Sequence, residues 1–215
     1  MTEALARGGS EINSIAETGF EVSSGAGPAT REETVGFGFW VFLLSDIVAF
    51  ATFFAAFAVL RDATDGGPDA RKLFDLQTVA WETAFLLLSS FACGLASLAL
   101  TQRKTFAAIA GFAAVLVFGG LFLSLELGEF SRLLAQGASP SRSAFLSAFF
   151  SLVGAHGLHV AAGLLWMMAL VAQLFTQGYR DRLDTRFFCF ALFWHALDLV
   201  WIGVFTIVYL MGMLR

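Results

Sequence analysis

The segment LVGAHGLHVAAGLLW, residues 152–166, places His156 and His159 three residues apart inside an otherwise apolar run. That run extends from about residue 144 to residue 175, which is long enough to cross the hydrocarbon core of a bilayer as a helix. Two imidazoles in such a helix can bind a metal or haem, carry protons, or hold helices together. The composition of the chain and its other polar groups bear on this choice.

The composition is typical of a membrane protein. Of the 215 residues, 58% are hydrophobic and only 14% are charged, whereas a soluble domain carries about 25% charged residues. A net charge of -4 gives no reason to expect a nucleic-acid partner. Cys93 and Cys189 both lie inside apolar runs, so we expect two free thiols rather than a disulfide.

Five apolar runs predict an all-α fold, a polytopic membrane protein with a bundle of five transmembrane helices in residues 35–215. Residues 1–34 are polar and lack the basic start and apolar core of a signal peptide, so we expect a mobile N-terminal tail. The third span is expected to continue as helix towards Leu134. The predicted spans cover residues 36–60, 78–100, 106–127, 144–175 and 187–213.

The basic residues bear on the orientation. The tail and the second and fourth loops hold seven Lys and Arg residues, against six on the other side, which by itself decides little. However, the second and fourth loops are short and their charges flank the spans, where the positive-inside rule applies. We therefore expect the N-terminus in the cytoplasm and the C-terminus in the periplasm.

Seven ionisable residues lie within the apolar runs, without any Lys or Arg. An ionised side chain at the centre of a membrane helix costs about 2.5–3.5 kcal/mol on insertion scales. These groups must therefore face protein, pair with one another or stay neutral, and four acids against three histidines suggest that at least one acid is protonated or hydrogen-bonded to a neutral imidazole. The seven are Asp46, Glu82, Glu126, His156, His159, His195 and Asp198.

The spacing of these residues indicates faces that point towards protein, since positions three, four or seven apart share a face of a helix. Glu82 shares its face with Ser89 and Cys93, and Glu126 shares its face with Glu129. His195 and Asp198 are followed on their face by Trp201. Small-residue pairs at Ser90/Gly94 and Gly120/Ser124 are of the type that lets membrane helices pack closely,.

Four chemical interpretations of this set can be compared. A haem needs two opposed histidines, and only His195 could oppose His156 or His159. A carboxylate-bridged di-metal site needs Glu-x-x-His pairs, which the chain lacks,. A proton relay is physically possible. Hydrogen bonds between helices, worth about 0.6–2 kcal/mol each, are the interpretation that we favour.

Five segments resemble subunit III of the haem-copper respiratory oxidases, and the resemblance covers residues 36–215. Within that family, the five-span length and the WETAFLLL segment are most similar to the cytochrome o ubiquinol oxidase subunit, with a five-span cytochrome c oxidase subunit as the alternative. A stand-alone proton-coupled transporter is a further alternative. The segments are GFWVFLLSD (38–46), WETAFLLLSS (81–90), LELGEF (125–130), AFLSAFFSLVGAHGLHV (144–160) and LFWHALDLVWIGVFTIVYLMG (192–212).

The resemblance implies a non-catalytic subunit in the bacterial inner membrane that supports the stability of subunit I and its proton delivery. It implies direct contact with subunit I, which holds the haem and copper, and places subunits II and IV in the same complex together with membrane lipids. No cofactor is expected in this chain. The family's intramembrane polar motifs map onto Glu82, Glu126, Glu129, His156, His159, His195, Asp198 and Trp201.

Overall fold

The structure is a computed structural model, which describes residues 31–65, 75–177 and 181–213. The chain forms two units, Met1–Thr34 and Val35–Arg215, and the second contains the long helices apart from the start of the first, which begins at Arg31. The expected mobile tail lies largely outside the described residues. Every described element is helical. The elements are α2 (Arg31–Leu60), α4 (Leu76–Thr101), α5 (Thr105–Ala135), α6 (Ala144–Gln177), α7 (Asp181–Val204), a π-helical turn η1 (Phe205–Leu210) and α8 (Met211–Met213).

Five of the described helical stretches are long and apolar enough to cross a membrane, which confirms the predicted number of spans and the all-α fold. Helix α5 continues to Ala135, as the sequence predicts. Helix α7 differs from the prediction, because it begins at Asp181 rather than at Phe187. The polar DRLDTR segment before the apolar run is therefore helical.

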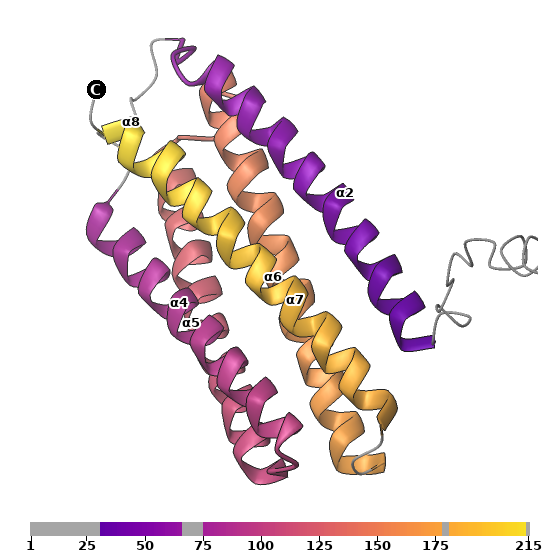
Figure 1. Cartoon of the computed structure of the whole chain (residues 1–215). Helices are drawn as coiled ribbons and strands as arrows, with labels where there is room; N and C mark the ends of the chain where they lie inside the picture. The colour runs from indigo at the N-terminus through magenta and orange to yellow at the C-terminus, as the bar shows by residue number, and fades with distance from the viewer. Residues whose placement is uncertain (1–30, 66–74, 178–180, 214–215) are drawn as a thin grey trace, which may run out of the picture. The chain divides into compact units, whose positions relative to one another are not determined.

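Helices α4 and α5 form a tight hairpin (Figure 1). The turn between them includes Arg103, whose φ of 58° is in the left-handed region. At the other end of α4, the Asp75 side chain caps the helix by accepting hydrogen bonds from the Thr78 hydroxyl and the Gln77 amide. These hydrogen bonds hold the pKa of the Asp75 carboxyl below its ordinary value,.

Close contacts between helices occur where one helix presents a glycine. A Cβ atom built on Gly111 of α5 would lie 2.7 Å from the Ala96 Cβ of α4. A Cβ atom on Gly163 of α6 would lie 2.9 Å from the Trp194 ring of α7. By contrast, Gly94 and Gly120 have nothing within 4 Å of such an atom, so within this chain these two glycines of the predicted small-residue pairs do not make close helix contacts.

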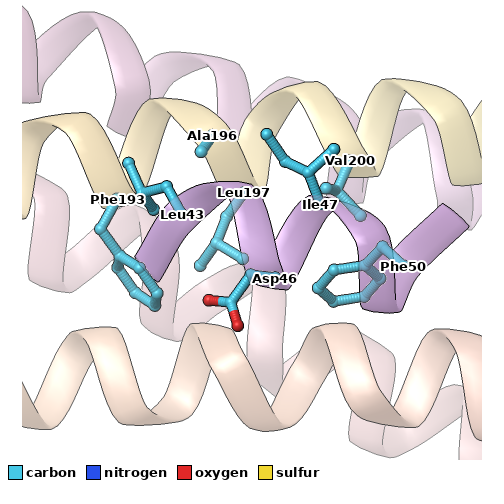
Figure 2. Close-up of a pocket in the computed structure, with 8 residues that line it drawn as sticks. All are labelled: Leu43, Asp46, Ile47, Phe50, Phe193, Ala196, Leu197 and Val200. Atoms are coloured by element: carbon cyan, nitrogen blue, oxygen red, sulfur yellow. The ribbon is translucent and has the colours of Figure 1, made fainter. Parts of the chain in front are cut away.

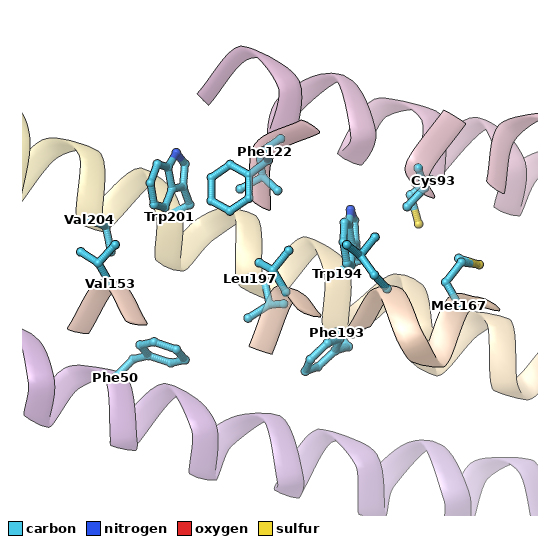
Figure 3. Close-up of a cluster of buried hydrophobic side chains, with 14 of the residues drawn as sticks. Phe50, Cys93, Phe122, Val153, Met167, Phe193, Trp194, Leu197, Trp201 and Val204 are labelled. Atoms are coloured by element: carbon cyan, nitrogen blue, oxygen red, sulfur yellow. The ribbon is translucent and has the colours of Figure 1, made fainter. Parts of the chain in front are cut away.

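The core contains large aromatic side chains from several helices (Figure 3). The ring of Phe122 on α5 lies edge-on to that of Trp201 on α7, with ring centroids 4.7 Å apart. In Figure 3 the indole nitrogens of Trp194 and Trp201 point to the same side of α7. Because lipid tails are as apolar as these side chains, the association of the helices depends on packing and on hydrogen bonds rather than on the hydrophobic effect.

Candidate functional site

The polar groups of α4 and α7 meet in three contacts along an antiparallel helix pair. The Trp201 indole N–H donates to the Thr83 hydroxyl at 3.0 Å, and the Trp194 indole N–H donates to the Ser89 hydroxyl at 2.9 Å. The Ser90 hydroxyl lies 2.8 Å from His195 Nδ1. Each hydrogen bond joins two helices inside the spans, where water is not available as an alternative partner.

His195 and Asp198 occupy the edge of this helix pair. His195 Nδ1 lies 3.8 Å from Asp198 Oδ2, and the imidazole side chain is 45% exposed whereas the Asp198 side chain is buried. Ser90, His195 and Asp198 do not form a hydrolase-type triad, because the hydroxyl and the carboxyl approach the same ring nitrogen,. The second nitrogen of the ring, Nε2, takes part in neither contact.

Three carboxyl groups are buried on the inner faces of α4 and α5, which the sequence predicts from the spacing of Glu82, Glu126 and Glu129. Glu129 is 3.5 Å from Arg132 and accepts a hydrogen bond of 3.4 Å from the Tyr209 hydroxyl. The carboxyl oxygens of Glu82 and Glu126 have no hydrogen-bond partner among the residues that the structure describes.

The Glu126 carboxyl lies against the backbone of α6. A Cβ atom on Gly157 would be 2.6 Å from Glu126 Oε1, so the glycine lets the carboxyl lie this close to α6. His156, the neighbour of Gly157, is completely buried, and neither of its ring nitrogens has a hydrogen-bond partner within the described ranges. Its ring packs instead against Trp201, at a centroid distance of 5.1 Å, and edge-on to Phe122. His156 therefore contacts its neighbours by ring packing, not by the hydrogen bond that the sequence suggests.

His159 lies on the side of α6 that faces α2. Its Nδ1 is 2.7 Å from the Ala155 carbonyl of its own helix, and its Nε2 is 4.0 Å from Asp46 Oδ2. The Asp46 carboxyl points towards α6 from a small apolar pocket between α2 and α7 (Figure 2). The pocket is lined by Leu43, Asp46, Ile47, Phe50, Phe193, Ala196, Leu197 and Val200.

The structure places most of the predicted site residues in three groups rather than one, and His156 packs separately against Trp201. Asp46 and His159 meet between α2 and α6, the three glutamates lie on α4 and α5, and His195 with Asp198 lies at the α4–α7 edge. Within the described residues, no group of three or more His, Cys, Asp or Glu side chains could hold a metal ion. Both cysteines are free and buried, as the sequence predicts.

Sequence reasoning missed four residues that take part in these contacts. Thr83 and Trp194 form hydrogen bonds between α4 and α7, Tyr209 binds Glu129, and Gly157 makes room for Glu126. The seven-residue spacing of Trp194 and Trp201, which places both indoles on one face of α7, is a signal that could have located the α4–α7 contact. No comparable spacing predicts the contact of Tyr209, because this residue lies in the π-helical turn.

The fold and these contacts define a multi-pass membrane protein in which several intramembrane polar groups lie at contacts between helices. Residues 15–213 match the family described as cytochrome c oxidase subunit III. The chain belongs to this family. It is therefore an accessory subunit of a terminal oxidase, and its partners are other subunits of that complex.

Individual relatives are similar over most of the chain. A cytochrome bo(3) ubiquinol oxidase subunit 3 from Pseudomonas aeruginosa is 52% identical over 178 residues, covering 83% of this chain and 85% of that protein. A protein of the same name from Pseudomonas putida is 48% identical, covering 82% and 86%. A cytochrome c oxidase subunit 3 from a Bacillus species, strain PS3, is 40% identical, covering 82% and 85%.

Proposed function

We propose that this chain is the non-catalytic subunit III of a proton-pumping quinol oxidase, in direct contact with subunit I, which holds the haem and copper. The observation that carries the proposal is the use of intramembrane polar groups in helix contacts. The Trp194–Ser89 and Trp201–Thr83 hydrogen bonds fix α7 against α4. Such an arrangement provides a rigid bundle to dock on a catalytic subunit rather than a reaction centre.

The choice of quinol as electron donor rests on the relatives. The two Pseudomonas proteins, whose names specify ubiquinol oxidase, are more similar to this chain than the PS3 protein, whose name specifies cytochrome c oxidase. The experiment is to purify the complex through a tag on this chain in mild detergent and to measure oxygen consumption with ubiquinol and with reduced cytochrome c. Activity with cytochrome c alone would support the alternative, and recovery of the chain without any oxidase would refute the proposal.

We also propose that the chain lies in the bacterial inner membrane with its N-terminus in the cytoplasm and its C-terminus in the periplasm. The charges that support this orientation flank the spans in the short second and fourth loops, where they have most effect. Reporter fusions after Thr34 and after Arg215 should report the cytoplasm and the periplasm, respectively. The reverse result would contradict the orientation.

The buried Glu82 is proposed to have a structural role rather than to carry protons. Its side chain is fully buried, and neither carboxyl oxygen has a described hydrogen-bond partner. Glu82→Gln preserves the volume of the side chain, so we expect a normal initial rate of oxygen consumption and normal retention of the subunit. Glu82→Ala leaves a cavity that costs about 2 kcal/mol or more, and should loosen retention of the chain in the complex.

The measurement for Glu82 is oxygen consumption and proton pumping by purified complexes, initially and after prolonged turnover, with the amount of this subunit determined in each sample. Comparing Gln with Ala separates the two roles, because an amide fills the same space as the carboxyl but cannot release a proton. A large and immediate loss of rate in a fully assembled Gln variant would show that Glu82 takes part in proton transfer.

A further inference from the structure

The His195 side chain differs from the other histidines in the surroundings of its second nitrogen. Both nitrogens of His159 have a polar group within 4.0 Å, and His156 is completely buried. His195 uses Nδ1 for its contacts with Ser90 and Asp198. Its Nε2 has no hydrogen-bond or ion partner among the described residues, although the side chain is 45% exposed.

The position of His195 places this nitrogen deep in the membrane. The span that contains it begins at Leu183, and at 1.5 Å of rise per residue His195 lies about 18 Å along the helix from that end. A lipid tail offers no hydrogen bond at this depth, and a polar group of this kind is costly to leave against hydrocarbon. Water and lipid headgroups lie at the ends of the span.

Several outward hydroxyl groups elsewhere in the spans do not pose the same problem. They donate a hydrogen bond to a carbonyl group one turn earlier in their own helix, so lipid can cover them without loss of a hydrogen bond. Examples are Ser45 to Phe42, Thr52 to Ala49 and Ser124 to Gly120. A ring nitrogen that points away from its helix has no such internal acceptor or donor.

We infer that the outer face of α4 and α7 around His195 is covered by a transmembrane helix of another subunit, which presents a hydrogen-bonding side chain to His195 Nε2. This inference rests on the proposed function, because it assumes an oxidase complex. The Ser90 and Asp198 contacts fix the imidazole and therefore pre-orient Nε2 for the partner. Phe91, the chain neighbour of Ser90, and Leu199, one turn after His195 on α7, are exposed apolar side chains that supply packing surface on the two helices.

The test places a photo-crosslinking amino acid at exposed positions in the tagged chain and irradiates the complex in the native membrane. Leu199 and Phe91 report on the proposed face, with exposed fractions of 71% and 67%. Leu158 and Leu165 on α6 are matched controls, with exposed fractions of 70% and 64%. We expect protein adducts with another oxidase subunit at Leu199 and Phe91, in much higher yield than at the two α6 positions.

Several outcomes overturn the inference while leaving the proposed function intact. These are adducts with an oxidase subunit only from α6, lipid adducts alone from Leu199 and Phe91, and adducts with a second copy of this chain. Failure of the proposed function appears differently, as the absence of any oxidase subunit from the tagged preparation before irradiation, which overturns both.

A second measurement tests the hydrogen bond itself. Loss of one interhelical hydrogen bond corresponds to a roughly three- to thirty-fold weaker retention of the subunit. We expect this loss for His195→Leu and partial recovery for His195→Gln, which restores a hydrogen-bonding group at similar length. Equal retention of the Leu variant and the unmodified chain on titration with detergent would overturn the contact at Nε2.

Discussion

Replacing Gly111 by leucine is expected to separate α4 from α5 and to lower the free energy of unfolding by about 3 kcal/mol, at the upper end of the usual cost of overpacking. Even a Cβ atom at this position would lie 2.7 Å from the Ala96 Cβ and 3.1 Å from its Cα. The backbone of α4 cannot move aside without disturbing the helix hairpin. The measurement is reversible unfolding of the separated chain in mixed detergent micelles.

Gly120→Leu is the matched control, because Gly120 lies on the same helix and a Cβ atom there would have nothing within 4 Å. Both substitutions gain the same helix propensity, so the difference between them isolates the contact with α4. The control should change the free energy of unfolding by about 0.5 kcal/mol or less beyond that gain. Equal stability of the two variants would contradict the close packing of α4 on α5.

Truncation of Trp194 to alanine is expected to cost about 3–5 kcal/mol, the range found for buried Trp and Phe residues. The side chain is almost completely buried, stacks on Phe190 at a centroid distance of 5.5 Å, and donates a hydrogen bond to Ser89. It also fills the space that Gly119 and Gly163 leave on α5 and α6. Its loss therefore weakens contacts with three helices at once.

Two further variants divide the Trp194 effect into its parts. Trp194→Phe keeps an aromatic ring and loses the indole N–H, so we expect a loss of about 1 kcal/mol. Trp81→Ala removes an indole of the same size from an exposed position on α4 and should have little effect on unfolding. A Trp194→Ala variant as stable as Trp81→Ala would show that the aromatic core does not hold the bundle together.

The sequence predicts the number and type of helices well, because apolar length and polar breaks are local properties of the chain. It predicts less well where a helix ends outside the membrane, as the start of α7 at Asp181 shows. It also does not predict the π-helical turn at Phe205–Leu210, in which the Met211 N–H bonds to the Thr206 carbonyl. Two residues of that turn, Val208 and Tyr209, are buried in the core.

For the candidate site, too, the sequence predicts some features and not others. Spacing along one helix predicts that Glu82, Glu126 and Glu129 face inward, and the structure confirms this orientation. It cannot show which helix faces which, so Gly94 and Gly120 look as suitable for close packing as Gly111 and Gly163. Likewise, it cannot distinguish a histidine that packs against aromatic rings, such as His156, from one that is partly exposed, such as His195.

The most direct test of the central claim is to separate this chain from the purified oxidase complex and to determine haem, copper and iron in both fractions. If the chain is an accessory subunit, all the haem and metal should remain with the other subunits, and the separated chain should show no Soret absorption band. The depleted complex should keep its initial rate of oxygen consumption but lose activity faster during turnover. A Soret band or stoichiometric metal in the fraction that contains only this chain would contradict the claim.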